Sequence, residues 1–340
     1  MKKRFFGILA CSLALTFALS GCGADTQLSF NNNVHDNTPG KSETLTYRVS
    51  SIDSDTTDDF TFSFDGTYTS TFTYYDDINH LSEDEQLKTT VQSNSLYNSL
   101  THKNFYLLTT NLSVTATYNF PGRDTKTYND SVQTKIVFAS VKDSLAPIYS
   151  YTRSKYTLIG IADNIAVSDF DDEYIVNYQK DKYTIKKVKD IGSNPTTSEN
   201  EYKYTAKTLI DNNQLFFAIR NLSLAEDAGT TLPTVSIAYG EKKSLYIKKD
   251  KSTTYNLDEL LYNDTTFTDE TISLAKYTYY VNQTNATGSE QSVYIQTANS
   301  NKGKLQNKAY IFKIESPIYE YARNSTIGTL TYTLTSIVKN

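Results

Sequence analysis

Apolar and polar residues alternate with a period of two along most of the chain after about residue 43. Leu45, Tyr47 and Val49 alternate with polar residues, and Phe60, Phe62 and Phe64 repeat the pattern. Such alternation is typical of strands with one buried and one wet face. Further strands are predicted at residues 67–75, 107–120, 131–141, 174–178, 183–188, 235–239, 244–248, 276–282, 292–298, 309–315 and 329–337. The pattern therefore predicts antiparallel strands, roughly a dozen in all.

Short segments with turn-forming residues separate these stretches. Asp65-Gly66 is expected to end one strand and begin the next, and a loop is expected to open at residues 121–122. Residues 179–182 and the Gly240-Glu241 pair are expected to close two hairpins. These connections are short, so neighbouring strands in the sequence are predicted to pair directly.

One stretch has helical rather than strand spacing. Leu215, Phe216 and Ile219 follow a start signal at Asp211, and a short amphipathic helix is predicted over residues 211–221. Asp211 and Gln214 resemble a capping box, in which the Asp accepts backbone N–H bonds and the Gln side chain reaches back to the helix start.

A second short helix is predicted after residues 82–85, which form another capping-box pattern followed by Leu87 and Val91 at helical spacing. Together the patterns predict a mainly β fold. We expect a large antiparallel sheet, half-barrel or sandwich-like, with one or two short helices packed on it.

The first 22 residues have the features of an export signal. Lys2, Lys3 and Arg4 precede an apolar stretch at residues 5–19, which is too short for an ordinary spanning helix. The stretch ends in Leu-Ser-Gly-Cys22, which resembles the lipobox of bacterial lipoproteins. That resemblance implies cleavage before Cys22, attachment of diacylglycerol to its sulfur and acylation such as palmitoylation. The alternative is an ordinary secretory signal with an incidental Cys.

These features suggest a division of the chain. Residues 1–21 are expected to be the signal peptide, polar residues 22–42 a flexible tether, and residues 43–340 the β domain, with 241–305 as a candidate insertion or subdomain. The expected location is the extracytoplasmic face of the bacterial membrane, held by the lipid on Cys22. No second long apolar stretch follows that would span the bilayer.

Composition narrows the expected partners and the source of stability. The chain contains 33 basic and 38 acidic residues, and loss of the three basic residues of the signal leaves 30 against 38. This acidic balance argues against nucleic acid as a partner. Only two Cys occur, at 11 and 22, so the mature chain has no disulfide. The 28 Tyr and 16 Phe residues must supply much of the core.

The β domain also carries a fainter resemblance. Residues 142–153, the helix start at 211–220 and the final Gly328–Leu334 phrase are similar to parts of the periplasmic lipoprotein-carrier-like half-barrel superfamily. Members of that superfamily carry or sense lipids and other hydrophobic molecules on the concave side of the sheet. The resemblance implies a similar half-barrel here, and it leaves residues 241–305 unassigned.

The chain offers little positive support for catalysis. Only three His residues occur, at 35, 80 and 102, without the spacing of a zinc motif, and no nucleophile elbow, P-loop or dinucleotide motif is present. We expect neither a metal nor a cofactor. Residues 169–173 form an acidic cluster, interpreted as a solvated loop, so a carboxylate hydrolase is a minor alternative.

The aromatic stripes are the remaining candidate for a binding site, because ligand pockets are mainly apolar with few polar groups. The candidate residues are Phe60, Phe62, Phe64, Phe72, Leu215, Phe216 and Ile219. The same residues would equally well form a packed core. The leading hypothesis is a non-enzymatic, membrane-anchored lipoprotein that binds a lipid or other hydrophobic or amphipathic ligand between sheet and helix. The alternative is a structural or adhesive surface module that binds wall polymer or protein.

Overall fold

The computed structural model describes residues 6–7, 30, 37–53, 61–81, 84–159, 167–192, 194–204, 209–236, 241–281, 290–297, 305, 308–320 and 325–340. The strands are β1 (Phe6–Gly7), β2 (Ser42–Asp53), β3 (Thr61–Tyr75), β4 (Phe105–Asn119), β5 (Lys126–Ala139), β6 (Pro147–Ile159), β7 (Val167–Tyr178), β8 (Lys182–Lys189), β9 (Thr196–Lys203), β10 (Ile210–Asp211), β11 (Gly229–Ser236), β12 (Glu241–Tyr262), β13 (Thr265–Val281), β14 (Gln291–Gln296), β15 (Ile311–Glu320) and β16 (Ser325–Lys339). The helices are α1 (Glu85–Gln92), α2 (Ser95–Ser99) and α3 (Leu215–Asn221), with short 3₁₀ turns η2 (Ile78–His80), η3 (Val141–Asp143) and η4 (Asn212–Gln214). The prediction of a mainly β chain is confirmed, and the described residues contain three short α-helices where one or two were predicted.

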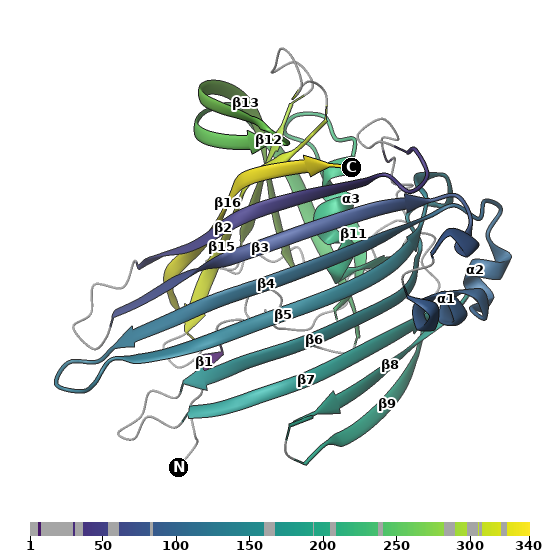
Figure 1. Cartoon of the computed structure of the whole chain (residues 1–340), viewed down its shortest axis with the longest axis horizontal. Helices are drawn as coiled ribbons and strands as arrows, with labels where there is room; N and C mark the ends of the chain where they lie inside the picture. Colours follow the sequence, from purple (N-terminus) through teal and green to yellow (C-terminus); the bar gives the residue numbers. More distant parts are fainter. Residues whose placement is uncertain are drawn as a thin grey trace.

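All sixteen of these strands belong to one sheet, in the order β10-β11-β12-β13-β14-β15-β16-β2-β3-β4-β5-β6-β7-β8-β9, with β1 beside β6. Most neighbours are antiparallel, as predicted, and the exceptions are two short parallel pairings, β10 with β11 and β12 with β16. Figure 1 shows β2 to β9 as one broad, twisted wall, with α3 behind it and β11 to β16 continuing the sheet. The sheet therefore curves around α3.

The core lies on the concave side of the sheet, and α3 is packed into it. The Phe217 ring of α3 lies 5.4 Å from Phe72, 5.0 Å from Phe138 and 5.1 Å from Tyr106, measured between ring centroids. Leu215 and Ile219 of the same helix belong to this core cluster, which also includes residues of β11 to β16. Because both walls contact the helix, α3 acts as the spacer between them.

A buried ion pair connects the C-terminal end of α3 to β2, and further contacts connect it to the segment before β15 and to β16. The Arg220 guanidinium donates to the carboxylate of Glu43 on β2 and, at 2.9 Å, to the backbone oxygen of Lys308. Lys339 of β16 approaches the other Glu43 oxygen at 3.2 Å. The side chains of Arg220 and Glu43 are each only 3 % exposed. An ion pair this deeply buried is stable only because its partners satisfy each other.

The helices α1 and α2 pack against the opposite face of the sheet at one end, as Figure 1 shows. Asp84 caps α1 by accepting the N–H of Leu87 at 3.0 Å, and Leu87 and Val91 are buried. The second helix predicted from the sequence is therefore confirmed, with Asp84 as its N-cap. The helices cover apolar side chains such as Phe105 and Ile148.

The expected turn at Asp65-Gly66 is wrong, because β3 continues through both residues. Gly66 pairs with Val49 of β2 on one side and Val114 of β4 on the other. A Cβ at this position would lie 2.2 Å from the backbone oxygen of Ser113. Gly66 therefore allows two strand backbones to approach each other closely, and it does not reverse the direction of the chain.

Several strands are longer than the sequence pattern predicted or were not predicted at all. The region 241–305 supplies β12, β13 and β14, which lie in the same sheet as the other strands. The long β12 and β13 strands pair through most of their length, with an irregularity between Lys249 and Ser252. The strands β6 and β9 were not predicted, and β7 begins at Val167, well before the predicted start.

Two parts of the segment predicted to be a tether touch the folded chain. Phe30 forms an isolated bridge with Leu222, just after α3, and packs against the core. The Tyr106 hydroxyl donates to the Asn37 side chain at 2.6 Å, and the Gly40 N–H donates to Tyr74 O at 2.9 Å.

Candidate functional site

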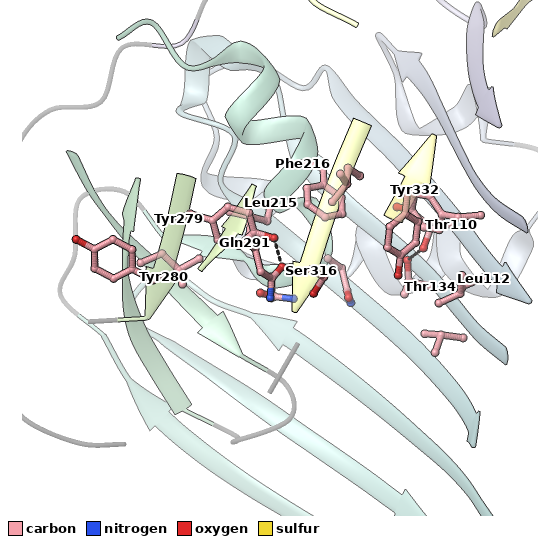
Figure 2. Close-up of a pocket in the computed structure, with 16 residues that line it drawn as sticks. Thr110, Leu112, Thr134, Leu215, Phe216, Tyr279, Tyr280, Gln291, Ser316 and Tyr332 are labelled. Carbon is pink, nitrogen blue, oxygen red and sulfur yellow. Dashed lines mark hydrogen bonds between the residues drawn. The ribbon is translucent and has the colours of Figure 1, made fainter. Parts of the chain in front are cut away.

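A pocket lies on the concave side of the sheet, beside the N-terminal end of α3 (Figure 2). About 1050 Å³ within it is free of protein atoms, its open mouth included, and the centre of a water molecule can reach about 120 Å³. The lining comprises Tyr68, Thr110, Leu112, Val132, Thr134, Asn212, Asn213, Leu215, Phe216, Leu245, Tyr279, Tyr280, Gln291, Ile314, Ser316 and Tyr332. Because these residues come from both walls and the helix, the curved sheet creates the pocket.

The start of α3 is fixed by a buried polar cluster. The Asp211 carboxylate accepts a hydrogen bond from the Tyr178 hydroxyl at 2.5 Å and another from the backbone N–H of Asn213 at 2.7 Å. The Asn213 side chain donates to Ser150 at 2.9 Å and Thr152 at 2.8 Å on β6. These bonds tie the helix start to β6 and β7, and so position the residues that follow it at the pocket.

Burial controls the ionisation of this cluster. Desolvation raises the pKa of Asp211 to about 6, although hydrogen bonds from Tyr178, Asn213 and Ser150 oppose the rise. The pKa of the Tyr178 hydroxyl is raised far above its usual value by burial and by the neighbouring Asp211 carboxylate.

The capping box expected at the helix start forms only in part. Asp211 caps the 3₁₀ turn η4, as the sequence predicts, but the Gln214 side chain does not reach back. Its amide donates instead to the backbone oxygen of Leu145 at 2.7 Å. Gln214 is fully buried, so a tertiary carbonyl replaces the local partner that an isolated helix would use.

The predicted helix residues divide between the pocket and the core. Leu215 and Phe216 line the pocket, and Figure 2 shows both beside it. Ile219 lies in the core, one turn along α3, and is not part of the lining. Phe216 is half-buried, which is consistent with its place at an opening rather than in packed interior.

The predicted strand residues lie elsewhere. Phe62, Phe64 and Phe72 are buried in the core and contact other aromatic rings, so none of them lines this pocket. Phe60 and the predicted lipidation residue Cys22 fall outside the described residues.

Sequence reasoning missed the tyrosines of the pocket. Tyr68 and Tyr332 lie edge to face with their ring centroids 5.6 Å apart, and the Tyr279 hydroxyl donates to the Gln291 side-chain oxygen. Burial raises the pKa of Tyr68 to about 12 and also raises that of Tyr279. A signal was available, because each residue occupies an alternating position of a predicted strand.

The acidic cluster at residues 169–173 lies in β7, so its interpretation as a loop is wrong. Asp171 pairs with Arg153 through two hydrogen bonds of 3.0 Å, and Asp172 accepts the Tyr174 hydroxyl proton at 3.3 Å. The adjacent guanidinium of Arg153 lowers the pKa of Asp171. The Asp171–Arg153 pair therefore links β7 to β6, whereas the Asp172–Tyr174 bond lies within β7. Within the described ranges, no group of three His, Cys, Asp or Glu residues is arranged to hold a metal ion.

Comparison with solved structures finds similar chains. One of them, the crystal structure of a β-barrel-like protein of the domain of unknown function DUF1849, from Brucella abortus, aligns with 88% of this chain and 98% of its own chain. The TM-score is 0.47 and the sequence identity is 9%. No protein-family model matches the chain, and no curated protein does so either.

None of the helices in the described part of the chain has the length and apolar character needed to cross a bilayer.

Proposed function

We propose that this chain is a lipid-anchored extracytoplasmic protein that binds a hydrophobic or amphipathic ligand, without chemical conversion, between the concave face of its sheet and α3. The observation that supports this best is the pocket at the start of α3. Its walls are mostly apolar, with a few neutral polar groups, which is the usual character of sites for small apolar ligands.

The structure of α3 supports this assignment. Phe217 anchors the helix in the core, while Phe216, the residue before it, stays half-buried at the pocket. An apolar ring left partly exposed on an otherwise packed helix favours contact with a ligand, because covering it removes apolar surface from water. In this proposal Leu215 and Phe216 form one side of the ligand site, and the strands form the other.

The proposed anchor rests on the signal and the lipobox-like residues that end at Cys22. Attachment of a lipid there would keep the pocket close to the membrane that supplies an apolar ligand. Expression of the full chain and its Cys22→Ala variant in a bacterium tests the anchor. The unaltered protein should fractionate with the membrane and carry an added lipid mass, and the variant should lack that mass. An unmodified Cys22 in the membrane-bound protein would contradict the proposal.

Ligand binding is tested by native mass spectrometry of the full chain recovered from bacterial cells. We expect a copurified mass of the size of a lipid on the unaltered protein and its loss from Phe216→Asp. An apolar ligand would strip water from the new carboxylate without offering it a partner, which is unfavourable. The matched control is Ile52→Asp, which places the same side chain at a residue that is 62% exposed and outside the pocket. A folded protein without ligand, or retention of ligand by Phe216→Asp, would contradict the proposal and favour a structural module.

A further inference from the structure

The described lining of the pocket carries no charge. All sixteen residues are apolar or neutral polar, and none is Asp, Glu, Lys, Arg or His. The chain as a whole contains 71 residues of the types Lys, Arg, Asp and Glu, so their absence from the described lining is a local property of this site. Any ionised group that entered the pocket would leave water without meeting an opposite charge on this lining.

The pKa shifts of the two inner tyrosines agree with the absence of charge in the described lining. Burial is the largest cause of the raised pKa of both Tyr68 and Tyr279. Hydrogen bonds from Ser70 and Thr110 oppose the rise at Tyr68, whereas at Tyr279 the neighbouring Tyr332 and Tyr68 add to it. By contrast, the pKa of Tyr47, a core residue outside the lining, is affected by a cation: the Arg220 charge lowers it, although burial has the larger, opposite effect.

The pocket nevertheless contains a defined polar spot. The Ser316 side chain is 2 % exposed, and its hydroxyl finds no hydrogen-bond partner among the described residues. Figure 2 shows Ser316 close to Gln291 and Tyr279, which are joined by a hydrogen bond. A buried hydroxyl without a partner is costly, and a ligand group that bonds to it would remove that cost.

The rest of the lining is suited to an apolar body. Leu215, Phe216, Leu245 and Ile314 come from α3, β12 and β15. On β4 and β5, the hydroxyls of Thr110 and Thr134 bond to each other at 2.7 Å. Among the described lining residues, the Ser316 hydroxyl is therefore the buried side-chain atom that lacks a hydrogen-bond partner.

We propose that the pocket selects an uncharged amphiphile, with its apolar chain against Leu215 and Phe216 and a neutral hydroxyl, ester or amide group at Ser316. This inference rests on the proposed function, since it specifies the ligand class of the same site. It excludes ligands that keep an ionised carboxylate, phosphate or amine inside the pocket. A lipid with a charged head would fit only if that head stayed outside the mouth.

The test compares three probes of equal chain length: dodecan-1-ol, dodecanoate and dodecylammonium. The full chain is made by cell-free synthesis without membranes or detergent, and each probe displaces the neutral dye Nile red at pH 7.5. We expect dodecan-1-ol to bind at least about tenfold more tightly than either charged probe, because burial of an unpaired charge is unfavourable. Equal or tighter binding of a charged probe would overturn the inference and leave the proposed function standing. Failure of Nile red and all three probes to bind would instead refute the proposed function.

Two variants separate charge selectivity from the different solubilities of the probes. Val132 on β5 is half-buried in the lining and packs against the core beside its cross-strand partner Leu112, whereas Gln133, the next residue, is exposed and is not part of the lining. Val132→Lys should raise the affinity for dodecanoate relative to dodecan-1-ol at least about threefold, and Gln133→Lys should not. Both variants should keep the circular dichroism of the unaltered chain. An unchanged ratio in folded Val132→Lys would overturn the inference.

The placement of the polar group has its own test. Ser316→Ala should weaken dodecan-1-ol binding by roughly 2- to 10-fold, which is the range expected for loss of one neutral hydrogen bond. Thr331→Ala, on the neighbouring strand β16 but outside the lining, is the matched control and should have no effect. Equal affinities for unaltered protein and Ser316→Ala would show that the ligand's polar group lies elsewhere.

Discussion

Replacement of Phe217 by Ala should destabilise the protein strongly, because this ring holds α3 between the two walls of the sheet. Three rings surround it, with centroid distances of 5.0 Å to Phe138, 5.1 Å to Tyr106 and 5.4 Å to Phe72. Truncation of a core Phe costs about 3–5 kcal/mol. Each aromatic pair adds about 0.5–1.5 kcal/mol beyond its buried area, so the upper part of that range is expected.

The matched control is Phe216→Ala, which makes the same chemical change one residue earlier. Its ring is half-buried at the pocket, so about 1 kcal/mol is expected, as for an average substitution. In urea, with a slope of about 3 kcal/mol/M, the midpoint should fall by about 1.3–1.7 M for Phe217→Ala and by about 0.3 M for Phe216→Ala. Nile red binding should show the opposite order, with the larger loss in Phe216→Ala.

The result that refutes this reasoning is an equal fall in midpoint for the two variants. Equal midpoints would mean that α3 has no fixed orientation between core and pocket. A large loss of Nile red binding in folded Phe217→Ala, with none in Phe216→Ala, would likewise place the ligand on the other side of the helix.

Three further changes test the fold around the site. Gly66→Ala should cost roughly 2 kcal/mol or more in urea unfolding, because its Cβ meets strand backbone, whereas Gly192→Ala, with open space around it, should be close to neutral. Arg220→Met should cost about 3–5 kcal/mol by leaving the Glu43 carboxylate buried with less compensation, and the double variant with Glu43→Leu should recover part of the loss in a double-mutant cycle. Burial raises the pKa of Asp211 to about 6, so the folded protein binds its proton more tightly than the unfolded chain, and the contribution of Asp211 to the free energy of unfolding should fall by about 3 kcal/mol as the pH rises from about 4 to about 6. Asp211→Asn should flatten that profile in a pH series of urea titrations, and identical profiles would contradict the assignment.

The period-two pattern was sufficient to predict the fold class and most strand positions. It worked because buried residues alternate with exposed or half-exposed residues along β2 and most of β4. It failed for the second half of β12, where residues 251–254 are all exposed and the buried core residues Leu257 and Leu260 stand three positions apart. It also failed at Gly66, because the sequence does not reveal whether a Gly reverses the chain or lets two backbones approach.

The candidate site was predictable only on its helical side. Leu215 and Phe216 stand at the start of a capped helix, and a helix that interrupts a long sheet must pack on one face of it. The strand side depends on which strands oppose the helix, and that follows from pairings such as β16 with β2, which the local pattern does not contain. Phe62 and Phe72 therefore proved to be core residues of the described structure, while Tyr279 and Tyr332 lie at the pocket.

The pairing of β16 with β2 determines when the pocket can exist at all. Asn340 and Ser42, joined by a hydrogen bond at this seam, are 298 residues apart in the chain. Tyr332 of β16 completes the pocket wall beside Tyr68 of β3, so this wall is missing until the last strand has docked. A chain that emerges N-terminus first must therefore keep β2 with an unpaired edge until β16 has been made. Under the proposed function, ligand capture can begin only after the seam between β16 and β2 has closed.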